Sequence, residues 1–390
     1  MVAIPTRPES GSFFERAGTL FFDSAGGPWT GLMILTYMFA LMGIQSAPAF
    51  SMWAFANRDP GPFPWQQVFA SSLIIGGIMF FFTAVQGLGV RILDMGLLPD
   101  TTPLNLPSSD YLVPYLIDTL ADKFPWFLGL LAVCALAAMQ STGAAYMSTA
   151  SGIITRDLYR HFFNREASQA AQVAVGRVTV GIVVSMALLV GLASGDLLVL
   201  LGGLAVSYGF QMWPALLGIC YIRFFTGKGV AWGLAAGLTA VTFTYVTELG
   251  GLIGIGRYPL TLHSAGWGII FNLLVTILVS ALTQEDTETK THRALFHDFL
   301  KEHTILSPEK RKWKKPIWLL TLVWFLFAIG PFAVLGNETN PANWLWGIPT
   351  AWIWQIAWWL IGCVMMYLLA FKLEMSTMPS REVAPLGQND

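Results

Sequence analysis

Nine apolar stretches of about twenty residues or more fix what this chain can fold into. Their length matches the helix needed to cross the hydrocarbon core of a bilayer. A bilayer offers the backbone no hydrogen-bonding partners, so each long apolar run predicts a helix. Of the 390 residues, 55% are hydrophobic and only 12% are charged, which excludes a soluble globular protein. The sequence therefore predicts an all-α polytopic membrane protein with helices over 30–56, 67–91, 125–155, 171–194, 196–222, 229–255, 264–284, 316–335 and 348–372.

The distribution of basic residues predicts the orientation of these helices. If the N-terminus lies outside, 17 of the 22 Lys and Arg residues fall on the inner connectors or the inner tail. Loops rich in Lys and Arg stay on the cytoplasmic side. We therefore expect a multi-pass protein of the cell (inner) membrane, with its N-terminus outside and its C-terminus in the cytoplasm.

The helix over 125–155 carries far more hydroxyl groups than a simple membrane anchor. Ala138, Ser141 and Thr142 stand at i, i+3 and i+4, so they share one face of one turn. One carbonyl and two hydroxyls offer three neutral oxygens, a set that suits a small monovalent cation better than Ca²⁺. The alternative is that the hydroxyls bond to carbonyls of their own helix or pack against a neighbour. The residues alone leave both open.

The helix over 30–56 has a weak centre. Gly43 and Pro48 flank Gln45 and Ser46, and the proline removes one helical hydrogen bond. A broken helix at this depth is tolerated where it lines a cavity, whereas a plain proline kink needs no cavity. Gln45 favours the cavity, because an amide inside a bilayer needs a partner.

The run AAMQSTGAAYMSTASGIITRDLYR, from Ala137 to Arg160, resembles a helix of the solute:sodium symporter family, which includes sodium:glucose and sodium:proline symporters. In that family, the first hydroxyl of an A-x-x-[ST]-[ST] motif stands sixteen residues before the Asp of a T-x-D-[ILF]-Y motif. Ser141 and Asp157 have that spacing. Residues 207–238 resemble the family's S-Y-x-x-P-P helix pair, although Trp213 replaces one proline. The resemblance covers roughly residues 30 to 285.

This resemblance implies a LeuT-type fold built from two inverted repeats, of which the helices up to residue 222 form the second. It also implies that Ala138, Ser141 and Thr142 bind sodium. The first repeat has no counterpart here, so we expect this sequence to be the C-terminal portion of a longer transporter. Five regions are predicted. They are an extracytoplasmic segment (1–29), the partial transporter core (30–285), an amphipathic and basic cytoplasmic connector (286–315), a transmembrane hairpin (316–372) and a cytoplasmic tail (373–390).

Six further residues are candidates for solute transport. Arg156 and Asp157 form either an inner gate or a solvated helix end. Gln211 either faces the solute path or bonds a neighbouring backbone. Gly43, Gln45 and Ser46, in the weak centre of the first helix, are the other candidates for the solute path. This centre differs in sequence from the same region of sugar-transporting family members. The resemblance therefore does not imply that the solute is a sugar.

The leading functional hypothesis is sodium-coupled symport of a small organic solute by alternating access. The alternatives are a fragment that does not transport alone, or a transporter-like membrane sensor or scaffold. The sequence shows no nucleophile, carboxylate pair or metal-ligand cluster at an interface, so no enzyme and no cofactor are expected, and Na⁺ is the one metal ion. The expected partners are sodium, the solute, membrane lipid and a further N-terminal portion, but no nucleic acid.

Overall fold

The structure is a computed structural model that describes residues 30–56, 61–94, 102–106, 111–193, 198–245, 257–336, 341–346, 348 and 350–375. Within these residues the regular structure is helical, apart from an isolated bridge between Leu345 and Ile348. This confirms the predicted all-α class. Six helices of the described part are long and apolar enough to cross a membrane, at Phe63–Gly87, Pro125–Phe163, Gln169–Leu192, Leu201–Cys220, Ser264–Leu282 and Trp352–Lys372. The expected total of nine and the LeuT-type arrangement stay predictions.

The chain divides into two compact units, which we describe separately. The first contains Met1–Ala47, Asn57–Ile78 and Gly202–Asp390, and the second contains Pro48–Ala56 and Met79–Leu201. The predicted helix over 30–56 is broken into α2 (Gly31–Leu41), α3 (Gly43–Ser46) and α4 (Pro48–Ala56). Ala47, between α3 and α4, has an extended backbone with φ −61° and ψ 137°. The weak centre is thus a true interruption.

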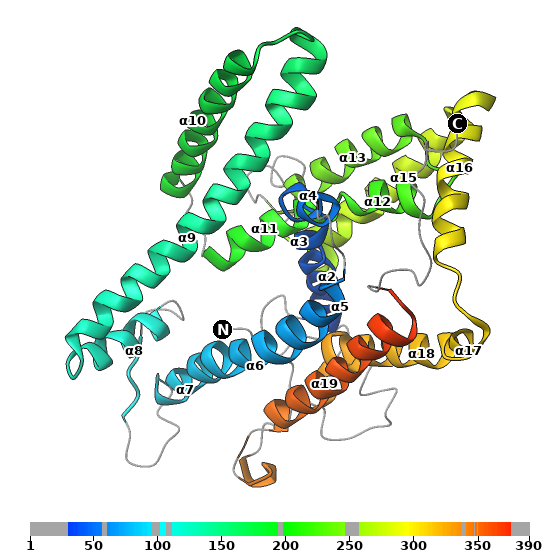
Figure 1. The fold of residues 1–390 in the computed structure, drawn as a ribbon. Coiled ribbons are helices and arrows are strands. Elements are labelled where there is room, and N and C mark those ends of the chain that lie inside the picture. Colours follow the sequence, from blue (N-terminus) through cyan, green and yellow to red (C-terminus); the bar gives the residue numbers. More distant parts are fainter. Residues whose placement is uncertain are drawn as a thin grey trace. The chain divides into compact units, whose positions relative to one another are not determined.

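The second unit is dominated by a long helical hairpin. In α9 (Pro125–Ile153) the proline occupies the first turn, where its missing N–H is tolerated. The helix continues as the π-helical segment η4 (Ile154–Phe163) and turns back into α10 (Gln169–Ala193) (Figure 1). Its other helices are α4, η2 (Phe80–Ala84), α7 (Val85–Asp94) and α8 (Leu112–Ala121). No residue in the most apolar window of α9 is buried by the protein.

The first unit has its core where α2, α11 (Leu198–Phe210) and α15 (Ser264–Leu282) meet, around Ala40, Phe210 and Ala265. The predicted helix over 196–222 is interrupted after Phe210 and resumes as α12 (Trp213–Cys220). Its remaining helices include α5 (Phe63–Trp65), η1 (Gln66–Ile75), α6 (Gly76–Met79), α13 (Gly227–Tyr245), α16 (Thr287–His303), α17 (Pro308–Arg311), α18 (Lys314–Trp324), η6 (Phe325–Ile329), η7 (Pro331–Gly336), α19 (Thr350–Tyr367) and η9 (Leu368–Lys372).

Helices α13 and α15 lie side by side over their whole lengths because a stripe of small residues lets them approach (Figure 1). Gly229, Gly233 and Gly237 stand four residues apart on α13. A Cβ atom at Gly229 would lie 2.1 Å from the Ser280 hydroxyl, and one at Gly233 would lie 1.9 Å from the Thr276 hydroxyl. Small residues at such spacing bring membrane helices into backbone contact.

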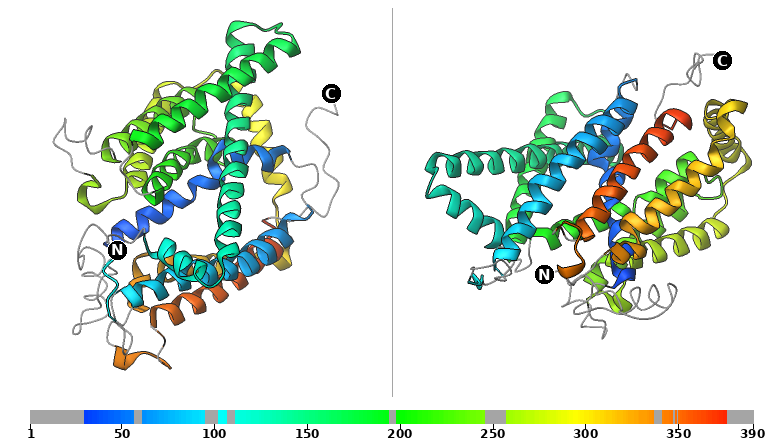
Figure 2. Two further views of the ribbon diagram at one scale, coloured as in Figure 1. Left: turned by 90° about the vertical axis from the view of Figure 1, so that its left-hand side faces the viewer. Right: turned by 90° about the horizontal axis from the view of Figure 1, so that it is seen from below.

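Helix α19 lies beside η1, in the helix over 63–78 (Figure 2). Two tryptophans of α19 donate hydrogen bonds to neighbouring helices. The Trp359 indole N–H donates to the Ser72 carbonyl at 2.8 Å, and the Trp354 indole N–H donates to the Phe327 carbonyl at 3.0 Å. Both acceptors lie in π-helical segments, η1 and η6. These tryptophans therefore join helices to one another. The boundaries predicted for the five regions of the chain stay predictions.

Candidate functional site

The three predicted sodium ligands lie on one turn of α9, within the second unit. The Ser141 hydroxyl donates to the Ala138 carbonyl at 2.9 Å. The serine hydroxyl is thus satisfied by its own helix, the local arrangement that polar residues in membrane helices often adopt. A hydroxyl that donates one hydrogen bond still keeps its oxygen lone pairs, so this bond leaves Ser141 able to face a cation.

Ser141 and Thr142 border a pocket of about 240 Å³ between α9 and α4. Ala49 and Phe50 line it from α4, and Ala145 and Tyr146 line it one turn further along α9. The Phe50 and Tyr146 rings meet edge to face, with 6.1 Å between their centroids. The first turn of α4, just after the break at Ala47, therefore lies beside the hydroxyl-bearing turn of α9, which the sequence alone did not reveal.

The lining of this pocket bears on the predicted cation site, which stays a prediction. Ser141 and Thr142 bring aliphatic hydroxyls to its lining, Tyr146 brings a phenol, and Ala49, Phe50 and Ala145 are apolar. Hard cations bound by proteins are surrounded by roughly six or more oxygens. Ser141 and Thr142 thus offer two candidate oxygens at the pocket, and the Ala138 carbonyl, outside the pocket lining, is the third predicted ligand. No group of three or more His, Cys, Asp or Glu side chains suited to a metal ion occurs among the described residues.

Gly43 and Ser46, predicted to line the solute path, lie in a close crossing of α3 and α11. A Cβ atom at Gly43 would lie 1.9 Å from the Val206 carbonyl oxygen, so no side chain fits there. The Ser46 hydroxyl donates to the Gly209 carbonyl at 2.8 Å. Gln45, in contrast, is exposed. Of the three, Gln45 is the one whose side chain is accessible in the described structure.

Gln211 lies at the interruption between α11 and α12 and is only 1% exposed. Its amide N–H groups donate to the Ser207 carbonyl at 3.1 Å and, more weakly, to the Ala265 carbonyl at 3.5 Å. Asn272 of α15 donates to the Gln211 backbone carbonyl at 2.8 Å. The bond to neighbouring backbone, one of the two roles considered for this glutamine, is therefore present. Its role in the solute path stays a prediction.

Two buried polar residues near this interruption were not identified from the sequence. Asn272 is fully buried, and Thr276 donates to its side-chain oxygen at 3.2 Å. Trp213 donates from its indole N–H to the Met42 carbonyl at 3.1 Å, just before the break in the first helix. The sequence did contain a signal for Asn272 and Thr276. Asn272, Thr276 and Ser280 are spaced four residues apart, as are Gly229, Gly233 and Gly237 on the preceding helix.

Arg156 and Asp157, the candidates for an inner gate, are adjacent in η4 and both exposed. Neither forms an ion pair with any residue that the structure describes. The ion pairs present elsewhere join Arg223 to Asp298, Arg293 to Glu285 and Lys310 to Glu374. The gate thus stays a prediction.

Comparison with known proteins relates the sequence of this chain to one family. The sequence model "SSF: Sodium:solute symporter family" matches residues 33–237, which is 205 of the 390 residues. The sodium/proline symporter of Salmonella typhimurium is 32% identical over 43% of this chain and 32% of its own length. The osmoregulated proline transporter of Bacillus subtilis is 28% identical over 41% of this chain and 31% of its own length.

A monocarboxylate transport permease protein of Rhizobium johnstonii is 30% identical over 48% of this chain and 39% of its own length. The chain thus spans about a third of the length of these curated relatives, and all three are transporters. No solved structure matches the chain. Because the family model covers more than half of the chain, and the described helices include six that can cross a membrane, this protein belongs to the sodium:solute symporter family.

Proposed function

We propose that this protein takes part in sodium-coupled symport of a small organic solute by alternating access. The observation that carries the proposal is the family match over residues 33–237, which includes the whole turn with Ala138, Ser141 and Thr142. The names of the relatives support a small organic solute, proline in two cases and a monocarboxylate in the third. The inner cell membrane, with the C-terminus in the cytoplasm, is the proposed location.

In this proposal sodium is transported together with the solute and is bound at the pocket between α4 and α9. Thr142 and Ser141 supply hydroxyl oxygens, and Ala138 supplies its carbonyl oxygen. Ser141 turns its hydrogen toward the carbonyl or toward another acceptor, while its lone pairs face the ion. The remaining ligands come from another part of the transporter, because three oxygens form only about half of a hard-cation shell.

The solute is proposed to pass near the interruption of the first helix, where Gln45 is accessible. Broken helices at the bilayer midplane expose backbone groups that bind polar solutes in transporters of this kind. Gly43, Ser46 and Gln211 then support the path by holding α3, α11 and α15 together. Arg156 and Asp157 are proposed to gate its inner end.

The test is sodium binding by the purified chain, measured as thermal stabilisation by NaCl against choline chloride at constant ionic strength. Ser141→Ala combined with Thr142→Ala should raise the sodium concentration needed for half of the effect at least tenfold, equivalent to roughly 1.4 kcal/mol. Ser185→Ala is the matched control, since Ser185 also donates to a carbonyl of its own helix, that of Gly181, but lies on α10. Equal sodium dependence of the double variant and the control would refute the site.

Uptake separates transport from the alternative of a non-transporting fragment or a sensor. The chain is reconstituted into liposomes with an inward sodium gradient, and L-proline and pyruvate serve as labelled probes. Sodium-dependent accumulation of either probe supports symport by this chain. Sodium binding without accumulation of either probe favours the alternative.

A further inference from the structure

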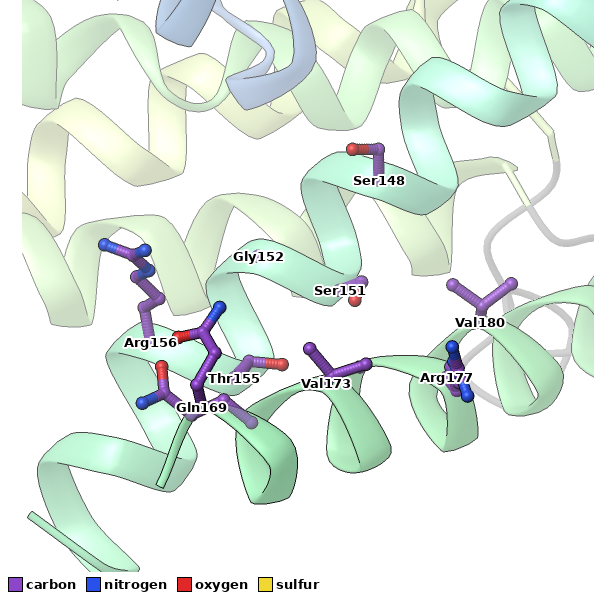
Figure 3. A pocket seen from close by; sticks show the side chains of 11 residues that line it. Ser148, Ser151, Gly152, Thr155, Arg156, Gln169, Val173, Arg177 and Val180 are labelled. Carbon is purple, nitrogen blue, oxygen red and sulfur yellow. The ribbon is translucent and has the colours of Figure 1, made fainter. Parts of the chain in front are cut away.

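A second pocket, of about 480 Å³, lies between the end of α9, η4 and the first turns of α10, entirely within the second unit (Figure 3). Among the residues that line it are Thr155, Arg156, Gln169, Gln172, Gly176 and Arg177. The sodium site does not use this pocket, and Arg156, the proposed gate residue, is the one lining residue that already has a proposed role in transport. Its lining is rich in hydrogen-bond donors.

The charge of the pocket is positive. Arg156 lies toward one end and Arg177 toward the other, with Thr155 between them in the view of Figure 3. No Asp or Glu is among the lining residues, and neither arginine is ion-paired with a residue of the described part. Guanidinium groups bind carboxylate and phosphate oxygens through paired hydrogen bonds. A cation would be repelled, so the ligand suited to this pocket is an anion.

One hydroxyl in the pocket lacks the partner that its burial requires. Thr155 is only 7% exposed, and its Oγ1 atom forms no hydrogen bond within the described residues. Buried polar atoms in folded proteins are nearly always paired with protein, water or a ligand. Gly176 faces this position from α10, where a Cβ atom would lie 2.8 Å from the Ser151 hydroxyl and 3.5 Å from Thr155 Oγ1. The glycine thus preserves the space beside both hydroxyls.

Neutral amides add further donors. The Gln172 amide nitrogen donates to the Ala167 carbonyl at 2.9 Å, which fixes the side chain and leaves its second N–H free of that bond. Gln169, in the first turn of α10, also lines the pocket. The first turn of a helix carries a partial positive charge. Two guanidiniums, two amides and a buried hydroxyl together make a set of donors for a multiply hydrogen-bonded oxyanion.

The elements that form the pocket carry exposed apolar residues. Val173 and Val178 of α10 are 43% and 63% exposed, and Phe162 and Phe163 at the end of η4 are 71% and 81% exposed. In a membrane protein these side chains contact acyl chains, and aromatic residues are frequent at the level of the lipid headgroups. Basic pockets between membrane helices bind anionic lipid headgroups.

We propose that this pocket binds a phosphate group beside the Thr155 hydroxyl, with Arg156 and Arg177 supplying positive charge from its two ends. The source is either the headgroup of an anionic phospholipid or free phosphate. The exposed apolar side chains on η4 and α10 favour the lipid. Binding would join η4 to α10 and stabilise the hairpin that carries the candidate sodium site, but it does not depend on sodium binding or on transport.

The test uses the full chain in a nonionic detergent and follows its thermal unfolding. The probes are dioctanoyl phosphatidylglycerol, inorganic phosphate and dioctanoyl glycerol, which lacks the phosphate, all at constant ionic strength. Dioctanoyl phosphatidylglycerol should raise the midpoint of thermal unfolding, and dioctanoyl glycerol should leave it unchanged. If inorganic phosphate also raises the midpoint, free phosphate is a sufficient ligand. If inorganic phosphate has no effect, the phospholipid is the ligand.

Three variants locate the effect. Arg156→Gln combined with Arg177→Gln should weaken the apparent affinity for phosphatidylglycerol roughly tenfold or more, and Thr155→Val should weaken it roughly threefold without a change of charge. The control is Arg160→Gln combined with Arg165→Gln, which removes the same charge from residues outside the pocket lining. The proposal is overturned if neither phosphate probe shifts the wild-type midpoint, or if the control loses as much affinity as the first variant.

Discussion

Replacing Gly233 by alanine tests the contact that holds α13 to α15. The added Cβ atom would lie 1.9 Å from the Thr276 hydroxyl and 2.7 Å from the Asn272 backbone oxygen. The threonine can rotate, but the carbonyl belongs to α15, so the helix itself must move away. Overpacking of this kind costs about 1–3 kcal/mol, and displacing the Thr276 hydroxyl endangers its bond to Asn272, worth about 1 kcal/mol.

Alanine also gains up to about 1 kcal/mol over glycine in helix propensity, so the net loss should be about 1–3 kcal/mol. This corresponds to a fall of several degrees in the thermal midpoint of the detergent-solubilised protein. Gly181→Ala on α10 is the matched control, because a Cβ atom there meets nothing within 4 Å in the described structure. If Gly233→Ala melts at or above the temperature of the control, the close packing of α13 and α15 is refuted.

Two further predictions concern His263 and Trp359 of the first unit. The pKa of His263, just before α15, is lowered from 6.5 to about 4 by burial and by the charge of Arg257. The unfolded chain therefore binds the proton more readily than the folded protein. The folding stability present above about pH 6.5 should be lost as the pH falls toward 4, by roughly 3 kcal/mol at most. Melting midpoints across this range should show the loss in wild type, and an equal slope in His263→Gln would contradict it. Trp359→Phe should destabilise the protein by about 1 kcal/mol because it removes the 2.8 Å bond to the Ser72 carbonyl. Trp313→Phe, at a partly exposed side chain, is the control, and an equal effect of both would argue against the indole bond.

The relation between the two pockets of the second unit bears on how the hairpin works. Both border α9, the first at Ser141 and Thr142 and the second from Ser148 onward. The first offers neutral oxygens and suits a cation, whereas the second offers two positive charges and suits an anion. One helix thus borders two pockets, one proposed for a cation and the other proposed for an anion. A ligand in the second pocket would order the helix that bears the first.

Some of this architecture was set by the sequence through hydrophobicity and local backbone chemistry. Long apolar runs must form helices because lipid leaves backbone groups no other partners, so the all-α membrane class followed directly. The interruption near Pro48 was also predictable, since proline removes a hydrogen bond at a fixed place. The motif spacing from Ser141 to Asp157 pointed to the family that the comparison later showed.

Other features depended on which helices meet. The sequence could not show that α11 ends at Phe210, because Gln211 and Trp213 are satisfied by distant partners, Asn272 and the Met42 carbonyl. It could not decide whether Gln211 bonds its neighbours, nor that the C-terminal tryptophans donate to other helices. Local pattern determines whether a segment is helical and which residues share a face. Whether a buried amide, hydroxyl or indole is bound to a partner depends on the neighbouring helix, and only the tertiary structure supplies that neighbour.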